Sequence, residues 1–216
     1  SEMCIRDRKK ASLVGAFFVG VIWHFPVLAF CPQPDKPQWV AVRQVVDGDT
    51  LRLVDGRSVR LIGINAPEIG RKGRTSEPYA EAARRRLQAL VKANDDRVGL
   101  VPGVEGKDKY GRTLAHIYSR NGDNLEAQLL SEGLGYRVAI APNVRFSGCQ
   151  QLAEQVARQA GVGLWRRSPV VAASDVRQSG FAVVRGRIEG IERNRGGVWL
   201  TPVSYTHLTL PTTPYV

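Results

Sequence analysis

The sequence contains few of the residues that bind metals through sulfur or imidazole. It has three cysteines and three histidines among 216 residues, with no Cys-x-x-Cys pair and no cluster of cysteine with histidine. This excludes a zinc finger or zinc ribbon as the basis of the fold. Three cysteines are also too few for a disulfide framework. Cys31 and Cys149 could pair in an oxidising compartment, but the sequence does not show whether they meet.

Negative charge is also scarce, and the chain has no internal repeat or low-complexity tract. Asp and Glu number 20 against 31 Lys and Arg, which gives a net charge of +11 and a pI near 10.1. Such an excess raises the local concentration of polyanions, so it favours nucleic acid or an anionic membrane surface as partner. The length allows one full domain and a fragment of another.

The N-terminal residues 1–31 have the pattern of an export signal. Four basic residues between 6 and 10 precede an uncharged, largely apolar run over 11–30. This order is typical of a secretory signal, but the run is long for one and close to the about 20 residues that cross a bilayer. A cleaved signal and an uncleaved anchor therefore stay open. We expect a protein that is periplasmic, secreted or anchored to a membrane through this segment alone.

The two ends of the chain are not expected to belong to the fold. Residues 1–8 and 204–216 resemble translated adapter sequence, and we expect both to be non-native ends of a truncated protein. Between them the composition divides the chain in four parts. These are a Pro-rich tether at 32–38, a barrel domain at 39–166, a polar linker at 167–179 and the start of a truncated second β domain at 180–203.

Hydrophobic periodicity predicts a β-rich α+β domain. Five short strands with tight turns and three helices match an OB-fold, a five-stranded Greek-key barrel. The predicted strands are 39–46, 50–54, 58–64, 97–101 and 113–119, and the predicted helices are 77–93, 124–132 and 146–160. Strands over 181–191 and 197–202 form the truncated β fragment.

Two details of the helices are predicted from single residues. Ser76 is a suitable N-cap for the first helix, with Pro78 in its first turn. In the last helix, Leu152, Val156 and Ala160 recur at helical spacing and are expected to face the core.

Three segments carry the chemistry, and each lies at the end of a predicted strand. They are 46–50 (Val-Asp-Gly-Asp-Thr), 60–68 (Arg-Leu-Ile-Gly-Ile-Asn-Ala-Pro-Glu) and 108–112 (Asp-Lys-Tyr-Gly-Arg). Carboxylate and carbonyl oxygens are the ligands that Ca²⁺ selects, and paired arginines suit a charged phosphate. A basic chain with both sets is suited to cutting a phosphodiester.

In order and spacing these segments resemble the staphylococcal nuclease (thermonuclease-like) family, from about Val40 to Trp165. The resemblance implies a role for each of eight residues. Asp49, Asn65 and the backbone carbonyl of Ala66 would bind Ca²⁺, or another divalent metal. Glu68, Arg60 and Arg112 would be catalytic, and Lys109 and Tyr110 would contact a second phosphate of the substrate.

The sequence departs from the family pattern at two places. Asn65 stands where the best-known member has Asp, so we expect weaker metal binding or a changed metal preference. The loop 136–143 lacks the aromatic residues that stack on bases in some relatives. Tyr136 is the only candidate there, and a core role suits it equally well.

These observations predict an exported, metal-dependent endonuclease that hydrolyses phosphodiester bonds of DNA, RNA or both, and acts as a monomer. A non-catalytic nucleic-acid-binding OB-fold module is the alternative, because Asn65 and the missing aromatics weaken the catalytic pattern. A membrane-associated scaffold would explain the charge and the apolar N-terminus but not the three segments.

Overall fold

The computed structural model describes residues 31–202, apart from residue 35 and the segments 71–72, 177–180 and 195–196. The expected export signal, except for its last residue, and the C-terminal tail 204–216 lie outside these residues. Among the residues that are described, no helix combines the length and apolarity that a membrane crossing would require.

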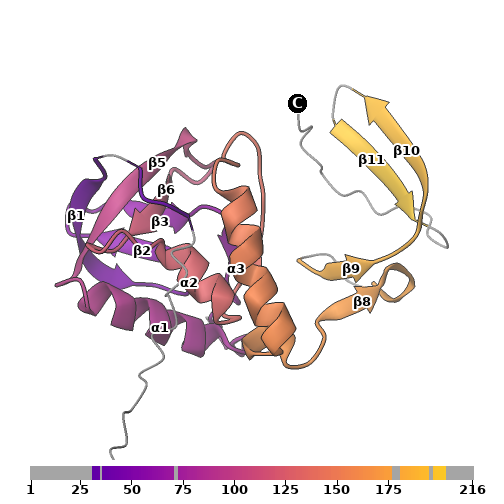
Figure 1. Cartoon of the computed structure of the whole chain (residues 1–216), viewed down its shortest axis with the longest axis horizontal. Helices are drawn as coiled ribbons and strands as arrows, with labels where there is room; N and C mark the ends of the chain where they lie inside the picture. The colour runs from indigo at the N-terminus through magenta and orange to yellow at the C-terminus, as the bar shows by residue number, and fades with distance from the viewer. Residues whose placement is uncertain (1–30, 35, 71–72, 177–180, 195–196, 203–216) are drawn as a thin grey trace, which may run out of the picture.

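A closed barrel of five strands forms the body of the molecule (Figure 1). Around the barrel the strand order is β1-β2-β3-β6-β5, and β5 pairs with β1 to close it. Every neighbouring pair is antiparallel except β3 and β6, which are parallel. The strands are β1 (Gln38–Val45), β2 (Thr50–Leu53), β3 (Ser58–Leu61), β5 (Arg97–Lys107) and β6 (Thr113–Tyr118). The predicted OB-type barrel is therefore confirmed.

The barrel interior is filled by alternate side chains of these strands. In β2 and β3 the buried residues are separated by an exposed or half-buried one, the period of two that a pleated strand imposes. Leu51, Val59, Val98 and Ile117 are among those with no exposed surface. The β2–β3 turn contains Gly56 at φ 90°, a backbone conformation that glycine adopts without strain.

Three helices accompany the barrel, as predicted: α1 (Ala80–Lys92), α2 (Leu125–Ser131) and α3 (Ser147–Ala160). The side chain of Asn124 caps α2 by accepting a hydrogen bond from the Ala127 N–H, and Gly133 follows the helix at φ 69°. A short ladder of β4 (Ile64–Asn65) with β7 (Tyr136–Arg137) and a 3₁₀ turn, η1 (Gly163–Trp165), complete this part.

The predicted start of α1 is wrong. The helix begins at Ala80 after Tyr79, which has φ 68° and provides no side-chain cap. Ser76 instead accepts a hydrogen bond from the Gly70 N–H, and it belongs to the loop that leads to the helix. The Ser76 hydroxyl does accept a hydrogen bond from a backbone N–H, as an N-cap would, but that N–H belongs to Gly70 and not to α1.

The predicted core face of α3 is also wrong. Leu152 is 58% exposed and Val156 is 40% exposed, whereas Gln150, Ala153, Glu154 and Ala157 are buried. The polar pair is buried because both side chains bind main chain: the Gln150 amide donates to the Ile62 carbonyl, and Glu154 accepts from the Arg137 N–H. Hydrogen bonds to the backbone therefore decide which face of this helix packs inward.

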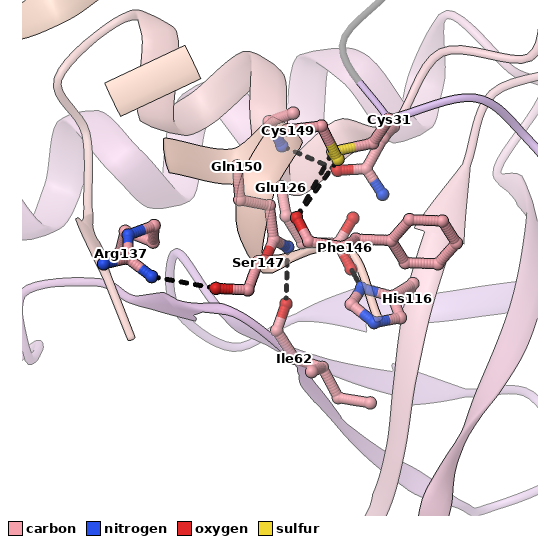
Figure 2. The surroundings of a disulfide bond; sticks show 11 residues. Cys31, Ile62, His116, Glu126, Arg137, Phe146, Ser147, Cys149 and Gln150 are labelled. Atoms are coloured by element: carbon pink, nitrogen blue, oxygen red, sulfur yellow. Dashed lines mark hydrogen bonds and ion pairs between the residues drawn. A yellow bond between two sulfur atoms is a disulfide. The ribbon is translucent and has the colours of Figure 1, made fainter. Parts of the chain in front are cut away.

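A disulfide joins Cys31 to Cys149 in α3, across 118 residues of sequence (Figure 2). The Cys31 side chain is buried in the same core as Val59 and Leu129. The disulfide thus joins Cys31, which precedes the tether and β1, to the core of the barrel domain.

Four short strands follow the barrel domain (Figure 1). β8 (Val170–Ala172) lies inside the predicted linker and pairs in parallel with β9 (Val183–Arg185), and the 3₁₀ turn η2 (Ala173–Asp175) follows β8. β10 (Ile188–Asn194) pairs antiparallel with β11 (Gly197–Pro202). The single strand predicted over 181–191 is therefore two strands, and β11 has the predicted bounds.

Candidate active site

The residues of the three segments gather at one end of the barrel, in two loops and around the end of β4. The β1–β2 loop carries Asp49, and the β5–β6 loop carries Lys109, Tyr110 and Arg112. In OB-folds these are the loops between the first two and the last two barrel strands, which commonly bind oligonucleotides and oligosaccharides. Arg60 lies on β3 between them.

The β1–β2 loop is held tightly against the rest of the domain. The Asp47 carboxylate accepts a hydrogen bond from the Asp49 N–H at 3.1 Å, the structural turn role expected of Asp47. At Gly48 an added Cβ would lie 2.6 Å from the Cβ atoms of both Ala66 and Ala83. Only glycine lets the loop approach α1 and the segment after β4 this closely.

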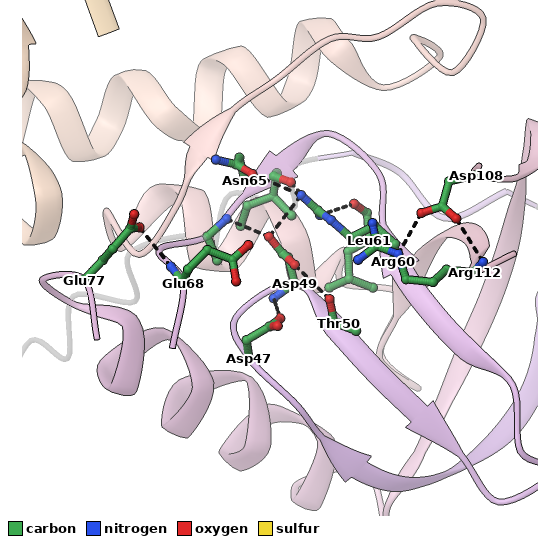
Figure 3. A network of polar contacts seen from close by, with 12 residues as sticks. Asp47, Asp49, Thr50, Arg60, Leu61, Asn65, Glu68, Glu77, Asp108 and Arg112 are labelled. Carbon is green, nitrogen blue, oxygen red and sulfur yellow. Dashed lines mark hydrogen bonds and ion pairs between the residues drawn. The ribbon is translucent and has the colours of Figure 1, made fainter. Parts of the chain in front are cut away.

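Asp49 is the most enclosed charged residue of the site, with 4% of its surface exposed. Its carboxylate accepts a hydrogen bond from the Ala66 N–H at 2.8 Å and another from the Thr50 hydroxyl at 3.0 Å. It also forms an ion pair with Arg60 at 3.1 Å (Figure 3). Three donors, the Thr50 hydroxyl, the Arg60 guanidinium and the Ala66 N–H, therefore fix the direction of this carboxylate.

The surroundings of Asp49 favour its protonated form, although three donors bond to the carboxylate. Burial raises the pKa of Asp49 to about 7, and the neighbouring Asp47 carboxylate adds to the rise. The Arg60 guanidinium and the Ala66 N–H oppose it but do not outweigh it. A buried carboxylate whose charge is only partly compensated would gain from a cation placed beside it.

Arg60 connects the strand to the neighbouring metal-ligand candidates. One guanidinium nitrogen donates to the carbonyls of Leu61 and Ile64, both at 2.8 Å. The other donates to the side-chain oxygen of Asn65 at 3.2 Å and pairs with Asp49 (Figure 3). The side chain is consequently fixed at the site before any ligand arrives.

The donor set fits a hard cation, although it carries little charge. Among the described residues no group of three or more His, Cys, Asp or Glu is arranged to hold a metal. The Asp49 carboxylate and the Asn65 amide oxygen both bond to Arg60, and Ala66 is bonded to Asp49. Oxygen ligands of this mixed kind, completed by water, are those that Ca²⁺ accepts.

Glu68 is exposed, and its backbone is fixed by a residue that the sequence reasoning missed. The Glu77 carboxylate accepts a hydrogen bond from the Glu68 N–H at 2.9 Å, while the Glu77 N–H donates to the Glu68 carbonyl at 3.0 Å. Together with the preceding Pro67, this two-way contact sets where the Glu68 side chain begins. Nothing in the sequence marks Glu77 for this contact, because a glutamate shortly before a helix is common and its partner Glu68 lies in a different part of the loop.

The β5–β6 loop has its own positioning carboxylate. Asp108 accepts hydrogen bonds from the N–H groups of Tyr110 and Arg112, both at 2.9 Å, and pairs with the Arg112 guanidinium at 2.7 Å. The Tyr110 ring lies 5.1 Å from the Lys109 ammonium and is 73% exposed. The loop presents two cations and a phenol to solvent.

Three clefts in the surface are lined by these groups, and they share some of their lining residues. A cleft of about 460 Å³ is shared by Arg60, Lys109, Tyr110 and Arg112. A second, of about 970 Å³, contains Glu68 and Arg112, and a third, of about 1090 Å³, contains Asn65 and Glu68. The predicted residues thus lie at one end of the barrel, with Asp49 and Ala66 buried beneath.

A closed OB-type barrel with a carboxylate, an amide and two arginines at this end defines a protein class whose site is suited to phosphate esters. The sequence pattern of the family described as Staphylococcal nuclease homologue matches residues 58–167. The chain belongs to this family.

Individual relatives agree with that assignment. A thermonuclease of Staphylococcus intermedius is 34% identical over 130 residues, 58% of this chain and 75% of that protein. Endonuclease YncB of Bacillus subtilis is 32% identical over 137 residues, 61% of this chain. The SPbeta prophage-derived endonuclease YokF of the same organism is 30% identical over 180 residues, 81% of this chain. The chain spans 64% of YncB and 56% of YokF.

Proposed function

We propose that this protein is an endonuclease that hydrolyses phosphodiester bonds of DNA or RNA with a bound divalent metal, for which Ca²⁺ is the first candidate. The observation that carries the proposal is the contact of Arg60 with both Asp49 and Asn65, next to clefts that Glu68 shares with Asn65 and with Arg112. The relatives, named as endonucleases and thermonuclease, support it.

The two arginines would bind the phosphate that reacts. Each guanidinium has a planar fork of N–H donors that matches two phosphate oxygens, and these bonds strengthen as negative charge grows in the transition state. Arg112 is oriented by Asp108, and Arg60 is oriented by the carbonyls of Leu61 and Ile64. A metal held at Asp49 and Asn65 would supply Lewis-acid stabilisation of the same phosphate.

Glu68 would act on the attacking water. It is exposed at the junction of two clefts, so water reaches it, and its backbone is held by Glu77. A carboxylate of this kind accepts a proton from water that attacks phosphorus, a contribution of about 10²–10⁴ in rate.

We also propose export. The buried Cys31–Cys149 bond suits an oxidising compartment, where structural disulfides persist. The basic and apolar pattern of residues 1–31 supports the same placement.

Non-catalytic binding of nucleic acid remains the second candidate, and one observation favours it. Asn65 adds no charge to the site, and its oxygen already accepts a hydrogen bond from Arg60. A site with one buried carboxylate would hold a metal weakly.

One experiment separates the two candidates. The full chain is incubated with supercoiled plasmid and with single-stranded RNA, with Ca²⁺ or with a chelator, and compared with Glu68→Gln and with Glu192→Gln, an exposed glutamate of β10. We expect metal-stimulated cleavage that falls at least about a hundredfold in Glu68→Gln and is unchanged in Glu192→Gln. A gel shift without cleavage by the wild-type chain, across several divalent metals, would instead establish the binding module.

A further inference from the structure

The cleft that contains Asn65 and Glu68 is built only in part by the barrel domain. Its cavity volume is about 1090 Å³, at the upper end for pockets that take drug-sized ligands. One part of its lining is the site itself, through Asn65 and Glu68. The other part comes from the chain after α3, through Arg166, Arg167 and Phe181.

Aromatic rings line this cleft, although the sequence of the loop 136–143 had suggested that residues able to stack on bases are missing. The Phe181 ring lies 5.1 Å from the Tyr136 ring at an interplanar angle of 34°, and Tyr136 in turn meets Trp165 edge-on at 5.6 Å. Phe181 keeps 53% of its surface exposed, and Tyr79, also at the cleft, keeps 37%. The loop 136–143 lacks further aromatics, but the segment beyond the barrel supplies one.

The cleft also holds two cations with no competing partner. Arg166 and Arg167 are exposed, and within the described part of the chain neither guanidinium forms a hydrogen bond or ion pair. The carboxylates of the cleft, Glu68 and Glu77, come instead from the barrel domain. A phosphate would therefore be drawn to the segment after α3 rather than to the barrel part of the cleft.

The position of the cleft relates it to the rest of the site. Figure 3 shows Glu68 and Glu77 on one side of Asp49, and Asp108 and Arg112 on the other. Lys109 and Tyr110 lie on the Arg112 side, in the cleft that contains Arg60 but not Glu68. A nucleic-acid strand bound across Arg60 would have one end next to Lys109 and its other end in the cleft that contains Asn65 and Glu68.

We propose that Arg166, Arg167 and Phe181 complete a second nucleotide subsite, in which Phe181 stacks on a base of single-stranded DNA or RNA and the two arginines bind the adjoining phosphates. This inference rests on the proposed function, because the bound strand is the substrate of the Glu68 site. Sequence-independent binding of single strands commonly combines such stacking with a basic groove. The subsite lies on the side of the reacting phosphate opposite Lys109 and Tyr110.

Binding of a fluorescent single-stranded oligonucleotide to the full chain, in chelator so that it is not cut, tests the aromatic contribution. Phe181→Ala should weaken binding about five- to a hundredfold, the measured range for removal of one stacking side chain. Phe181→Tyr should bind as the wild type does. Phe181→Leu keeps the apolar packing on Tyr136 but should bind as weakly as Phe181→Ala.

The arginines are tested by the salt dependence of the same binding. Arg166→Gln with Arg167→Gln should lower the slope of log affinity against log salt by about 0.7 for each phosphate that is no longer neutralised. Arg185→Gln with Arg187→Gln removes equal charge from exposed residues that follow Phe181 in the chain but do not line the cleft, and should leave the slope unchanged.

A small diester, bis(p-nitrophenyl) phosphate, separates failure of the subsite from failure of the proposed function. If the subsite is real, Phe181→Ala hydrolyses it with metal as fast as the wild type, within about twofold. If the wild type cleaves DNA or RNA but Phe181→Ala binds the oligonucleotide normally, the subsite is refuted and the nuclease stands. If the wild type neither cleaves nor binds, both are refuted.

Discussion

The two halves of the site are held in different ways. In the half formed by the β1–β2 loop, β3 and β4, the Asp49 and Arg60 side chains are only 6% and 17% exposed, and Arg60 bonds to four neighbours. In the β5–β6 half, the Arg112 side chain is 32% exposed and bonds to Asp108 alone among the described residues, and Tyr110 is largely exposed. Under the proposed function, the buried half would fix a phosphate and a cation in place, whereas the outer half would adjust to the strand that binds.

The largest expected effect compares Arg60→Lys with Arg112→Lys. Lysine keeps the charge but has no planar fork, so each change should lower kcat/KM by about 10²-fold, the lower range for removal of a transition-state donor. Only Arg60→Lys should also destabilise the fold, by about 1–2 kcal/mol, because the carbonyls of Leu61 and Ile64 lose their donor. Arg112→Lys should cost less than about 1 kcal/mol.

Steady-state kinetics and chemical denaturation of both variants check this comparison. Equal decreases in stability would show that the buried contacts of Arg60 do not hold the inner half. Near-normal turnover in both would show that charge alone is sufficient.

Asn65→Asp should have a smaller effect, confined to the inner half. It adds a formal charge beside Asp49, and charge count is a main determinant of Ca²⁺ affinity at oxygen sites. We expect the Ca²⁺ concentration for half-maximal cleavage to fall several-fold. Asn121→Asp, in an exposed turn after β6, adds the same charge elsewhere and serves as control. If a Ca²⁺ titration moves equally in both variants, residue 65 does not coordinate the metal.

A pH dependence of stability is also expected, with opposite sign in the two halves. Burial raises the pKa of Asp49 to about 7, so the folded, metal-free protein binds this proton more tightly than the unfolded chain does. The resulting stabilisation is present below about pH 4 and is lost as pH rises through about 7. Burial also acts on Asp108, but hydrogen bonds from Arg112 and the Tyr110 N–H outweigh it and lower the pKa of that carboxyl. Its stabilisation is present above about pH 4 and is lost on acidification.

Denaturation in chelator at a series of pH values checks both signs. The free energy of unfolding of the wild type minus that of Asp49→Asn should decrease as the pH is raised from 4 to 7. The same difference for Asp108→Asn should decrease as the pH is lowered from 4. The first expectation is contradicted if the Asp49→Asn difference is flat between pH 4 and pH 7.

Much of the barrel could be predicted from the sequence because its signals are local. The strands of the hairpin around Asp55 and Gly56 alternate with a period of two, and Asn124 and Gly133 mark both ends of α2. The three segments of the site could be recognised from their motifs and from their order along the chain. Their convergence is then a property of OB topology, which places the β1–β2 and β5–β6 loops at one end.

What could not be predicted depends on partners far away in the sequence. Leu152 and Val156 give α3 an apolar stripe, but Gln150 and Glu154 are turned inward by the Ile62 carbonyl and the Arg137 N–H. The pairing of Cys31 with Cys149 spans 118 residues, and the contact of Glu77 with Glu68 crosses a loop. Hydrophobic periodicity contains no information about such polar contacts.

The disulfide divides the polypeptide into a ring and two branches. Every peptide bond between Cys31 and Cys149 lies inside the ring, so a single proteolytic cut there opens it without releasing a fragment until the bond is reduced. The segment after Cys149 is a branch, and a cut directly after Trp165 would release Arg167 and Phe181 while the barrel stays covalently whole. The same protease would thus leave the Glu68 site intact and remove the segment that encloses the cleft beside it.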